Sequence, residues 1–277
     1  MSFRAVIFDL DGVLYRGGSL CPGAAEGTTA VRADGLAVLF MTNNASRTPE
    51  QVAEHLNALG IEAHRDEVLN SSQVGAAHLA QERDTGEGSA AGEDPVVLAV
   101  GGPGVAAALR EEGFACVTAA EVSEDGPPRP FWAVLQGYGP EMMVHDLHEV
   151  AYALHEGAIW VATNADSTLP TGRGLAPGNG ALLAAVTHGT GHTPVVVGKP
   201  YPRSYGIALD RLGLAAEEVL AVGDRLDTDI EGARAAGLRS ALVLTGVHGR
   251  EDARSAAEER RPDLVVESIP DLRDHWR

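Results

Sequence analysis

The sequence is poor in cysteine, in aromatic residues and in positive charge. Among 277 residues there are 2 cysteines and 5% aromatics, and 21 lysines and arginines stand against 39 aspartates and glutamates. Cys21 and Cys116 are too few for a disulfide framework and have no metal-ligand spacing, which is typical of a reducing compartment. The net charge of −18 disfavours nucleic acid and anionic membrane surfaces as partners.

Long apolar runs are also missing. No stretch approaches the about 18 apolar residues that a membrane-spanning helix needs. The first apolar strand begins by Ala5, so we expect no signal sequence before it. We therefore expect a cytoplasmic protein with no membrane partner. If such an acidic protein acts on an anionic substrate, it must gather positive charge locally, from a metal, a lysine or helix N-termini.

Apolar strands alternate with helices along the chain, an order that predicts an α/β protein with parallel strands. The expected helices cover residues 24–33, 49–60, 71–83, 141–155 and 203–212, and a further helix follows a turn at 101–104 and ends at 112. The expected strands cover residues 5–8, 36–41, 96–100, 114–118, 131–136, 158–162, 194–197, 219–222, 240–244 and 264–266. The pattern has no internal repeat of the solenoid type.

A small, acidic, glycine-rich segment at residues 84–94 is typical of a linker. A length of 277 residues is comfortable for two domains. We predict that residues 1–83 and 189–277 form one domain, in which the strand at 194–197 belongs to the same sheet as the first strand. Residues 84–188 are expected to form an inserted α/β domain with its own small core.

Two aspartates stand where the first apolar strand ends. In an extended chain the side chains of Asp9 and Asp11 fall on the same side, and Gly12 lets the backbone turn closely past whatever they hold. Two like charges this close favour a bound cation. The alternative for this stretch alone is a solvated acidic turn.

Three further apolar strands also end in polar residues. Thr42, Asn43 and Asn44 follow the second strand, and Lys199 and Asp224 follow two strands of the C-terminal part. Because ligands bind at the carboxyl ends of parallel strands, we expect these residues in one crevice. With Asp9 and Asp11 they supply a nucleophile, a second carboxylate, a hydroxyl, a cation and a metal ligand, which suits phosphoryl transfer.

Four polar segments resemble the four motifs of the haloacid dehalogenase (HAD) superfamily and follow one another in the same order. They are Asp9-Leu10-Asp11-Gly12, the strand end at Thr42, Gly198-Lys199-Pro200, and the run from Gly223 to Ile230. The resemblance extends over essentially the whole chain. The insertion between the second and third motifs resembles the class C2 cap. Thr42-Asn43-Asn44 and the run from Gly223 to Ile230 resemble the NagD-like or p-nitrophenyl phosphatase branch. The implied fold is a Rossmann-like parallel-sheet HAD core with an inserted α/β cap domain.

The resemblance implies a phosphatase that hydrolyses small phosphorylated metabolites through an aspartyl phosphate. Asp9 would be the nucleophile and Asp11 the general acid and base. The cofactor would be Mg²⁺, held by Asp9, by the backbone carbonyl of Asp11 and by Asp224. The presence of Asp11 favours a phosphatase over a dehalogenase, because halide departure needs no proton.

The same resemblance implies roles for the remaining residues. Thr42, Asn43, Asn44 and Lys199 would bind the phosphate group. Asp229 would support these residues from behind without touching the substrate.

Substrate choice is expected in the inserted domain, because the core crevice recognises only phosphate. The candidate loop contains Asn164, Asp166 and Leu169. Pyridoxal phosphate phosphatases of this family carry a histidine where Leu169 stands, which disfavours that substrate, whereas a phosphoglycolate-like or nucleotide-like substrate stays open. Other members of the branch often dimerise through the cap, so a homodimer is an expectation here.

Two other functions stay open at this stage. A phosphomutase would also need Asp9 and Asp11, but it would protect the aspartyl phosphate from water. A ligand-binding protein could keep the HAD fold without the chemistry. The intact set of Asp9, Asp11, Thr42, Lys199 and Asp224 disfavours the second alternative.

Overall fold

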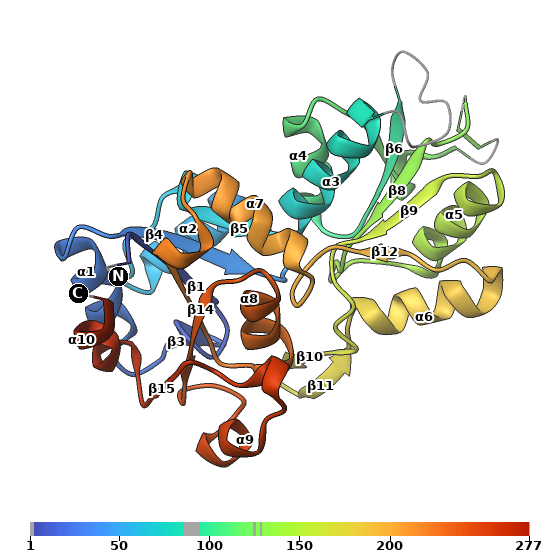
Figure 1. Ribbon diagram of the computed structural model, residues 1–277. Helices are drawn as coiled ribbons and strands as arrows, with labels where there is room; N and C mark the ends of the chain where they lie inside the picture. The colour runs from blue at the N-terminus through green and yellow to red at the C-terminus, as the bar shows by residue number, and fades with distance from the viewer. Residues whose placement is uncertain (1–2, 86–94, 124–125, 128, 277) are drawn as a thin grey trace. The chain divides into compact units, whose positions relative to one another are not determined.

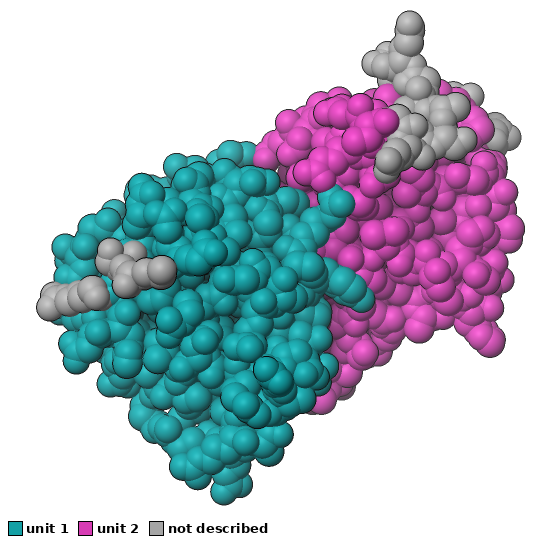
Figure 2. All heavy atoms as spheres, in the orientation of Figure 1, with its two compact units in different colours: residues 1–42, 49–69, 199–277 teal, residues 43–48, 70–198 magenta. Residues whose placement is uncertain are grey.

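The computed structural model of the chain describes residues 3–85, 95–123, 126–127 and 129–276. The chain folds into two compact units, which are coloured separately in Figure 2. The first unit consists of Met1–Thr42, Pro49–Leu69 and Lys199–Arg277, and the second consists of Asn43–Thr48 and Asn70–Gly198. Each unit contains its own sheet and its own apolar core.

The first unit is built on a six-stranded sheet with the order β15-β14-β13-β1-β4-β5 (Figure 1). Its strands are β1 (Ala5–Phe8), β4 (Ala37–Thr42), β5 (Val68–Asn70), β13 (Val219–Gly223), β14 (Arg239–Val243) and β15 (Leu264–Val266). Strand β1 pairs in parallel with both β13 and β4, and β14 and β15 continue the parallel order. Every residue of β1 and β13 is buried, as expected for central strands of a parallel sheet.

The helices of the first unit follow the strands along the chain. They are α1 (Ala24–Ala33), α2 (Pro49–Ala58), α7 (Pro202–Leu212), α8 (Glu231–Ala235), α9 (Arg250–Ser255) and α10 (Arg273–Trp276). Short 3-10 helices cover Arg65–Glu67, Ala216–Glu218, Glu258–Arg260 and Ile269–Leu272, and a π-helical turn, η4, covers Leu226–Ile230. Fully buried Phe8, Phe40 and Trp276 lie in the core of this unit. A small antiparallel hairpin, β2 (Tyr15–Arg16) and β3 (Ser19–Leu20), follows β1.

The second unit is built on a five-stranded parallel sheet with the order β12-β9-β8-β6-β7. Its strands are β6 (Val96–Val100), β7 (Ala115–Thr118), β8 (Ala133–Gln136), β9 (Ile159–Ala162) and β12 (Val195–Val196). Its helices are α3 (Ser71–Thr85), α4 (Pro103–Glu111), α5 (Val144–His155) and α6 (Asn179–Thr190), with a 3-10 turn at Ala119–Glu121. An antiparallel hairpin of β10 (Thr168–Thr171) and β11 (Gly174–Pro177) lies between β9 and α6.

The structure corrects the prediction that the strand at 194–197 belongs to the first sheet. Its residues Val195 and Val196 pair instead with Val161 and Ala162 of β9, at the edge of the sheet of the second unit. A short apolar run specifies a buried strand but not its partner. Lys199 therefore reaches the first unit from the loop before α7 and does not stand at the end of one of its strands.

Helix α3 packs mainly against α4 and β8, so it belongs to the second unit, although most of its residues precede the predicted boundary at 84. The predicted linker at 84–94 lies almost wholly outside the described residues. The domain boundaries at 84 and 188 stay predictions. Within the described part of the chain, no helix combines the length and the apolar character that crossing a membrane requires.

Candidate active site

The first unit brings the ends of β1 and β13 together. Phe8 is paired with Val222, and the backbone N–H of Asp9 donates to the carbonyl of Val222 at 2.9 Å. Asp224 stands two residues beyond Val222. Because the two strands are parallel neighbours, Asp9 and Asp224 leave the sheet at the same edge.

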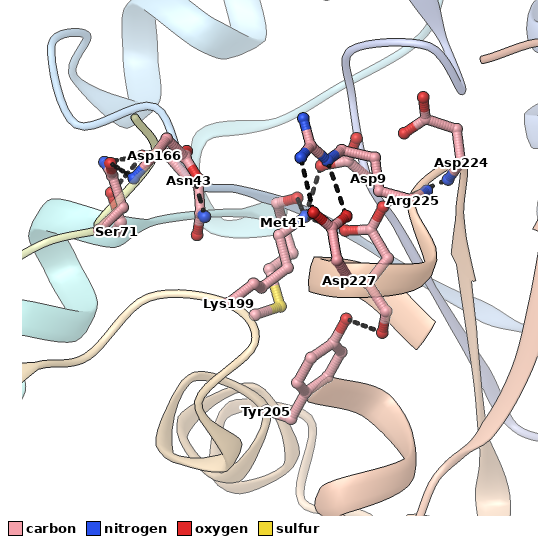
Figure 3. A network of polar contacts seen from close by, with 12 residues as sticks. Asp9, Met41, Asn43, Ser71, Asp166, Lys199, Tyr205, Asp224, Arg225 and Asp227 are labelled. Atoms are coloured by element: carbon pink, nitrogen blue, oxygen red, sulfur yellow. Dashed lines mark hydrogen bonds and ion pairs between the residues drawn. The ribbon is translucent and has the colours of Figure 1, made fainter. Parts of the chain in front are cut away.

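Lys199 lies against this edge, and it is the only lysine in the sequence. Its Nζ donates to Oδ1 of Asp9 at 2.5 Å (Figure 3). It also donates to Oδ1 of Asp229 at 2.7 Å. The residue is only 5% exposed. A buried ammonium group between two carboxylates has a fixed position. Because the carboxylates outnumber it, an anionic substrate would need a further cation at this site.

Asp229 is held by several backbone and side-chain groups. Its Oδ2 accepts the N–H groups of Asp224 at 3.2 Å and of Arg225 at 3.1 Å, while Oδ1 accepts from Lys199. The hydroxyl of Tyr205 donates to the backbone carbonyl of Asp229 at 3.0 Å. Both carboxylate oxygens of Asp229 are therefore already used in orienting the lysine and the turn after β13.

Asp224 has one oxygen with a partner and one without. Its Oδ2 accepts the N–H of Val247 at 2.7 Å. Its Oδ1 is buried and has no hydrogen-bond partner among the described residues. A buried carboxylate oxygen without a partner is costly, and a bound cation would remove that cost.

Two glycines let the chain pass close to Asp224. Gly12 has a φ of 83°, and a Cβ there would lie 2.2 Å from Oδ2 of Asp224. A Cβ on Gly246 would lie 2.0 Å from both Cβ and Oδ2 of the same aspartate. Only glycine fits these two positions. The backbone at both glycines therefore packs directly against the side chain of Asp224, the candidate metal ligand.

The pKa values follow from burial and from the surplus of negative charge. Burial raises the pKa of Asp9 well above its usual value; Lys199 opposes this, and Asp229 and Asp224 add to it. Burial and the charge of Asp229 raise the pKa of Asp224 to about 7. Burial lowers the pKa of Lys199, but Asp229 and Asp9 outweigh burial and keep the ammonium group charged.

The residues present fit a divalent metal ion. Carboxylate oxygens of Asp9, Asp224 and Asp229 lie within 4.8 Å of one another. Since Asp229 is engaged by three donors, Asp9 and the unpartnered Oδ1 of Asp224 are the better ligands. Oxygen ligands are those that Mg²⁺ prefers, and waters usually complete its shell.

Asp11 and Thr42 lie on the segments that follow β1 and end β4. Asp11 is exposed and forms an isolated backbone bridge with Tyr15, and the N–H of Gly12 donates to the carbonyl of Tyr15 at 2.8 Å. Thr42 is the last residue of β4 and is buried. Their predicted roles stay predictions.

Asn43 and Asn44 belong to the second unit, where their loop is firmly held. The carbonyl of Asn43 accepts from Oγ of Ser71 at 2.6 Å and from Nδ2 of Asn164 at 2.8 Å. Oδ1 of Asn44 accepts the backbone N–H and the hydroxyl of Ser46, both at 2.8 Å. The side chain of Asn44 thus shapes its own turn.

The three residues predicted for the cap substrate loop have different surroundings. Asn164 is 4% exposed; besides holding Asn43, its Oδ1 accepts the N–H of Asp166 at 3.1 Å. Oδ2 of Asp166 accepts from Nδ2 of Asn43 at 3.4 Å (Figure 3). Leu169 lies in the hairpin strand β10, opposite Ala176 of β11. Asn164 therefore acts first as a link between two loops, whereas the segment around Leu169 forms a hairpin.

Comparison with known proteins identifies the family. The chain matches the family described as haloacid dehalogenase-like hydrolase over residues 6–115, and a second HAD-hydrolase-like family over residues 196–272. The D-glycerol 3-phosphate phosphatase of Mycobacterium tuberculosis is 41% identical over 267 residues, which cover 96% of this chain and 70% of that protein. The chain belongs to the haloacid dehalogenase-like hydrolases.

Other relatives of this HAD-like hydrolase extend the comparison. The 5′-nucleotidase YutF of Bacillus subtilis is 33% identical over 97% of this chain and 96% of its own length. A glycerol phosphate phosphatase of M. tuberculosis, solved in complex with magnesium, has a TM-score of 0.85 and 41% identity, and the match covers 98% of this chain and 76% of that one. NagD of Escherichia coli K-12 has a TM-score of 0.81 and 30% identity, with 97% and 98% covered.

These comparisons confirm three predictions for the HAD-like hydrolase. The superfamily with its NagD-like branch, the α/β fold class and the enzyme class, a HAD-type phosphoric monoester hydrolase, are as the sequence predicts. The roles of individual residues are not tested by likeness to relatives and stay predictions.

Sequence reasoning missed several residues that organise the site of this HAD-like hydrolase. Tyr205 is buried in α7 and anchors the backbone of Asp229, while Gly246 and the N–H of Val247 hold Asp224. A buried tyrosine in a helix looks like ordinary core, and a backbone N–H leaves no trace in the sequence. The one available signal was the predicted strand at 240–244. It pairs in parallel with β13, so the residues that follow it, including Gly246 and Val247, lie near Asp224.

Proposed function

We propose that the protein is a Mg²⁺-dependent phosphatase of small phosphomonoesters that acts through an aspartyl phosphate on Asp9. The observation that carries this proposal is the charge arrangement of the first unit. The single lysine of the chain is buried between Asp9 and Asp229, close to a carboxylate oxygen of Asp224 that has no described partner. Carboxylates in this arrangement can hold a metal ion, and the metal and the ammonium group together can neutralise the negative charge of a phosphoryl group.

In the first step, an oxygen of Asp9 attacks phosphorus, and the bond from phosphorus to the substrate oxygen breaks. Asp11 gives its proton to that leaving oxygen. In the second step, Asp11 takes a proton from water, the water oxygen bonds to phosphorus, and the bond to Asp9 breaks. Inorganic phosphate leaves, and both aspartates return to their starting state.

The metal would be Mg²⁺, which a relative holds in its crystal structure. Asp9, Asp224 and the backbone carbonyl of Asp11 would hold it. When bound, it cancels negative charge on the carboxylates and on the phosphoryl oxygens, so that a carboxylate can approach a dianion. Asp229 stays with Lys199 and the turn after β13.

Lys199 binds the transferring phosphoryl oxygens and holds Asp9 in position through the hydrogen bond of 2.5 Å. Thr42 and the backbone N–H of Asn43 donate to the same phosphoryl oxygens. The side-chain oxygen of Asn44 is bound by Ser46, so Asn44 contributes by fixing the turn that presents Asn43.

The second unit would act as the cap that selects the substrate, as the insertion predicted at residues 84–188 implies. Within it, the hairpin that carries Leu169 is the best candidate for contact with the organic part of the substrate. Asn164 holds the base of that segment. A homodimer formed through this unit is part of the proposal.

The substrate class is a small phosphorylated metabolite. The relatives are named for D-glycerol 3-phosphate, for 5′-nucleotides and for acid sugar phosphatase activity, and a phosphomonoester is what they have in common. The proposal therefore commits to the phosphomonoester group and leaves the organic part to measurement.

The test is phosphate release from p-nitrophenyl phosphate, glycerol 3-phosphate, 5′-nucleotides and sugar phosphates, with Mg²⁺ and with a chelator. We expect turnover that needs Mg²⁺, with a clear order of kcat/KM across the panel. Formation of a bisphosphate without release of phosphate would instead favour a phosphomutase. Mg²⁺ binding without release of phosphate from any compound would favour a ligand-binding protein.

A further inference from the structure

The loop that follows β14 lies directly against Asp224. The N–H of Val247 donates to Oδ2 of Asp224 at 2.7 Å, and the N–H of His248 donates to the backbone carbonyl of Asp224 at 3.1 Å. Gly246 packs on the side chain of the aspartate so closely that no Cβ fits there. The position of this loop therefore fixes the position of Asp224.

The same loop is tied to the turn that carries Asp11. Oγ1 of Thr245 donates to the backbone carbonyl of Gly12 at 2.7 Å. A Cβ on Gly12 would lie 3.1 Å from Cα of Gly246, so the two backbones are in contact here. The guanidinium group of Arg16, in the hairpin after this turn, donates to the carbonyl of Gly246.

Thr245 is therefore the side chain that joins the two segments. The first segment is the loop after β14, which holds Asp224. The second is the turn at Asp11 and Gly12, and the backbone carbonyl of Asp11 is a metal ligand in the proposed function.

We propose that Thr245 is a positioning residue that sets the affinity of the site for Mg²⁺. Its hydroxyl holds the backbone beside Asp11 at the correct distance from the loop that carries Asp224. Thr245 touches neither the substrate nor the metal. The inference rests on the proposed function, because it assumes that Asp224 and the Asp11 carbonyl share one Mg²⁺.

The expected size of the effect follows from other metal sites, in which loss of a hydrogen-bond partner behind a ligand weakens metal binding by about 10–100-fold. Thr245→Val keeps the shape of the side chain and removes the hydroxyl, so it should raise the dissociation constant for Mg²⁺ by at least about 10-fold. Thr245→Ser restores the hydroxyl and should return the affinity to within about 3-fold of the wild type, a rescue that packing alone would not give.

The experiment is titration of each protein with Mg²⁺ alone by calorimetry, followed by the Mg²⁺ dependence of p-nitrophenyl phosphate turnover. The control is Thr29→Val, which removes a hydroxyl that donates to Ala25 within α1 at 2.8 Å. For Thr245→Val we expect a higher Mg²⁺ activation constant and a kcat that recovers at saturating Mg²⁺. For Thr29→Val both values should match the wild type.

The inference would be overturned if Thr245→Val bound Mg²⁺ as tightly as the wild type. It would also be overturned if Thr245→Val and Thr245→Ser lost the same amount of Mg²⁺ affinity. If the wild type itself binds no Mg²⁺, the proposed function fails and not this inference alone. Should Thr245→Val not fold, Arg16→Gln provides the second test, because it weakens the hold on Gly246 from the exposed side. It should weaken Mg²⁺ binding by a few-fold, and unchanged affinity would count against the proposal.

Discussion

The two units build the same kind of parallel sheet but place different chemistry where the strands end. In the first unit, β1 is followed by Asp9 and β13 by Asp224, and Lys199 lies against Asp9. In the second unit, β8 ends in Gln136, and Asn164 follows β9. All of these side chains are largely buried, yet one set is charged and the other is neutral.

The neutral set is held together by internal hydrogen bonds. Oε1 of Gln136 accepts from Nε1 of Trp160 at 3.2 Å, and Nδ2 of Asn179 donates to the backbone carbonyl of Asn164 at 2.8 Å. Nε2 of Gln136 and Oδ1 of Asn179 are buried without a hydrogen-bond partner among the described residues, as Oδ1 of Asp224 is, but these amides carry no charge. The charged set has more carboxylates than ammonium groups, so we expect a bound cation to stabilise it. Uncharged amides at the strand ends of the second unit are thus expected to hold loops, whereas the charged groups of the first unit are expected to bind a ligand.

The largest expected effect comes from removing the nucleophile. Asp9→Asn keeps the size of the side chain but removes the carboxylate that attacks phosphorus, so kcat should fall by at least about 10³-fold. Steady-state turnover of p-nitrophenyl phosphate at saturating Mg²⁺ checks this. Asp66→Asn, at an exposed aspartate far along the chain, is the matched control and should be unchanged. Turnover retained in Asp9→Asn would remove the proposed nucleophile.

Replacing the only lysine should affect both activity and stability. Lys199→Met keeps the apolar stem and leaves Asp9 and Asp229 without their common cation. We expect kcat to fall by about 10²–10³-fold and the metal-free protein to lose about 3–5 kcal/mol of stability near pH 8. The stability loss should shrink at lower pH, where a carboxylate takes up a proton. Chemical denaturation at two pH values measures it, and equal stability to the wild type would mean that the buried charges need no partner.

The stability of the metal-free protein should also depend on pH, because Asp224 is a buried carboxylate. Burial raises the pKa of Asp224 to about 7, whereas an aspartate in an unfolded chain titrates near about 3.9. Between these values the folded protein binds more protons than the unfolded chain, so rising pH favours unfolding. Melting curves of the metal-free wild type should therefore lose stability relative to Asp224→Asn as pH rises from about 4 to about 7.

Mg²⁺ should reverse this trend, because it binds ionised carboxylates. The rise in melting temperature on adding Mg²⁺ should be larger above about pH 7 than below about pH 6. The same rise should be absent from Asp224→Asn. A parallel course of the two proteins across the whole pH range, with and without Mg²⁺, would contradict the assignment of Asp224 as a ligand.

The smallest effect on chemistry is expected in the second unit. Asn164→Ala removes the donor to Asn43 and the acceptor for Asp166, which should cost about 1–3 kcal/mol of stability. The affinity for Mg²⁺ should stay at the wild-type value, as calorimetry can check. Unchanged stability together with a specific rise in KM would return Asn164 to the role of a substrate contact.

Much of the fold could be predicted from local signals. The prediction of β1 at 5–8, of α1 at 24–33 and of β6 at 96–100 agrees with the observed bounds. These elements have continuous apolar runs or helical periodicity, with glycine close to their ends. In contrast, β5 and the hairpin of β10 and β11 were missed. The three residues of β5 are too few for a recognisable apolar run, and the four-residue strands of the hairpin contain proline and glycine, which are typical of loops.

The candidate site could likewise be predicted only where local signals determine it. The strand-end positions of Asp9 and Asp224 follow from parallel order, which the alternation of strands and helices predicts. The sheet to which residues 194–197 belong was predicted wrongly, because strand pairing depends on long-range packing. The contacts of Tyr205, Thr245 and Val247 could not be predicted, since they involve backbone groups brought close only by the complete fold.

The measurement that tests the central claim most directly is a rapid acid quench of the enzyme during turnover with Mg²⁺, followed by peptide mass analysis. The account predicts a phosphoryl group on the peptide that contains Asp9, and its loss when the substrate is exhausted. A phosphoryl group on another residue would contradict the account, as would phosphate release in which Asp9 is never modified.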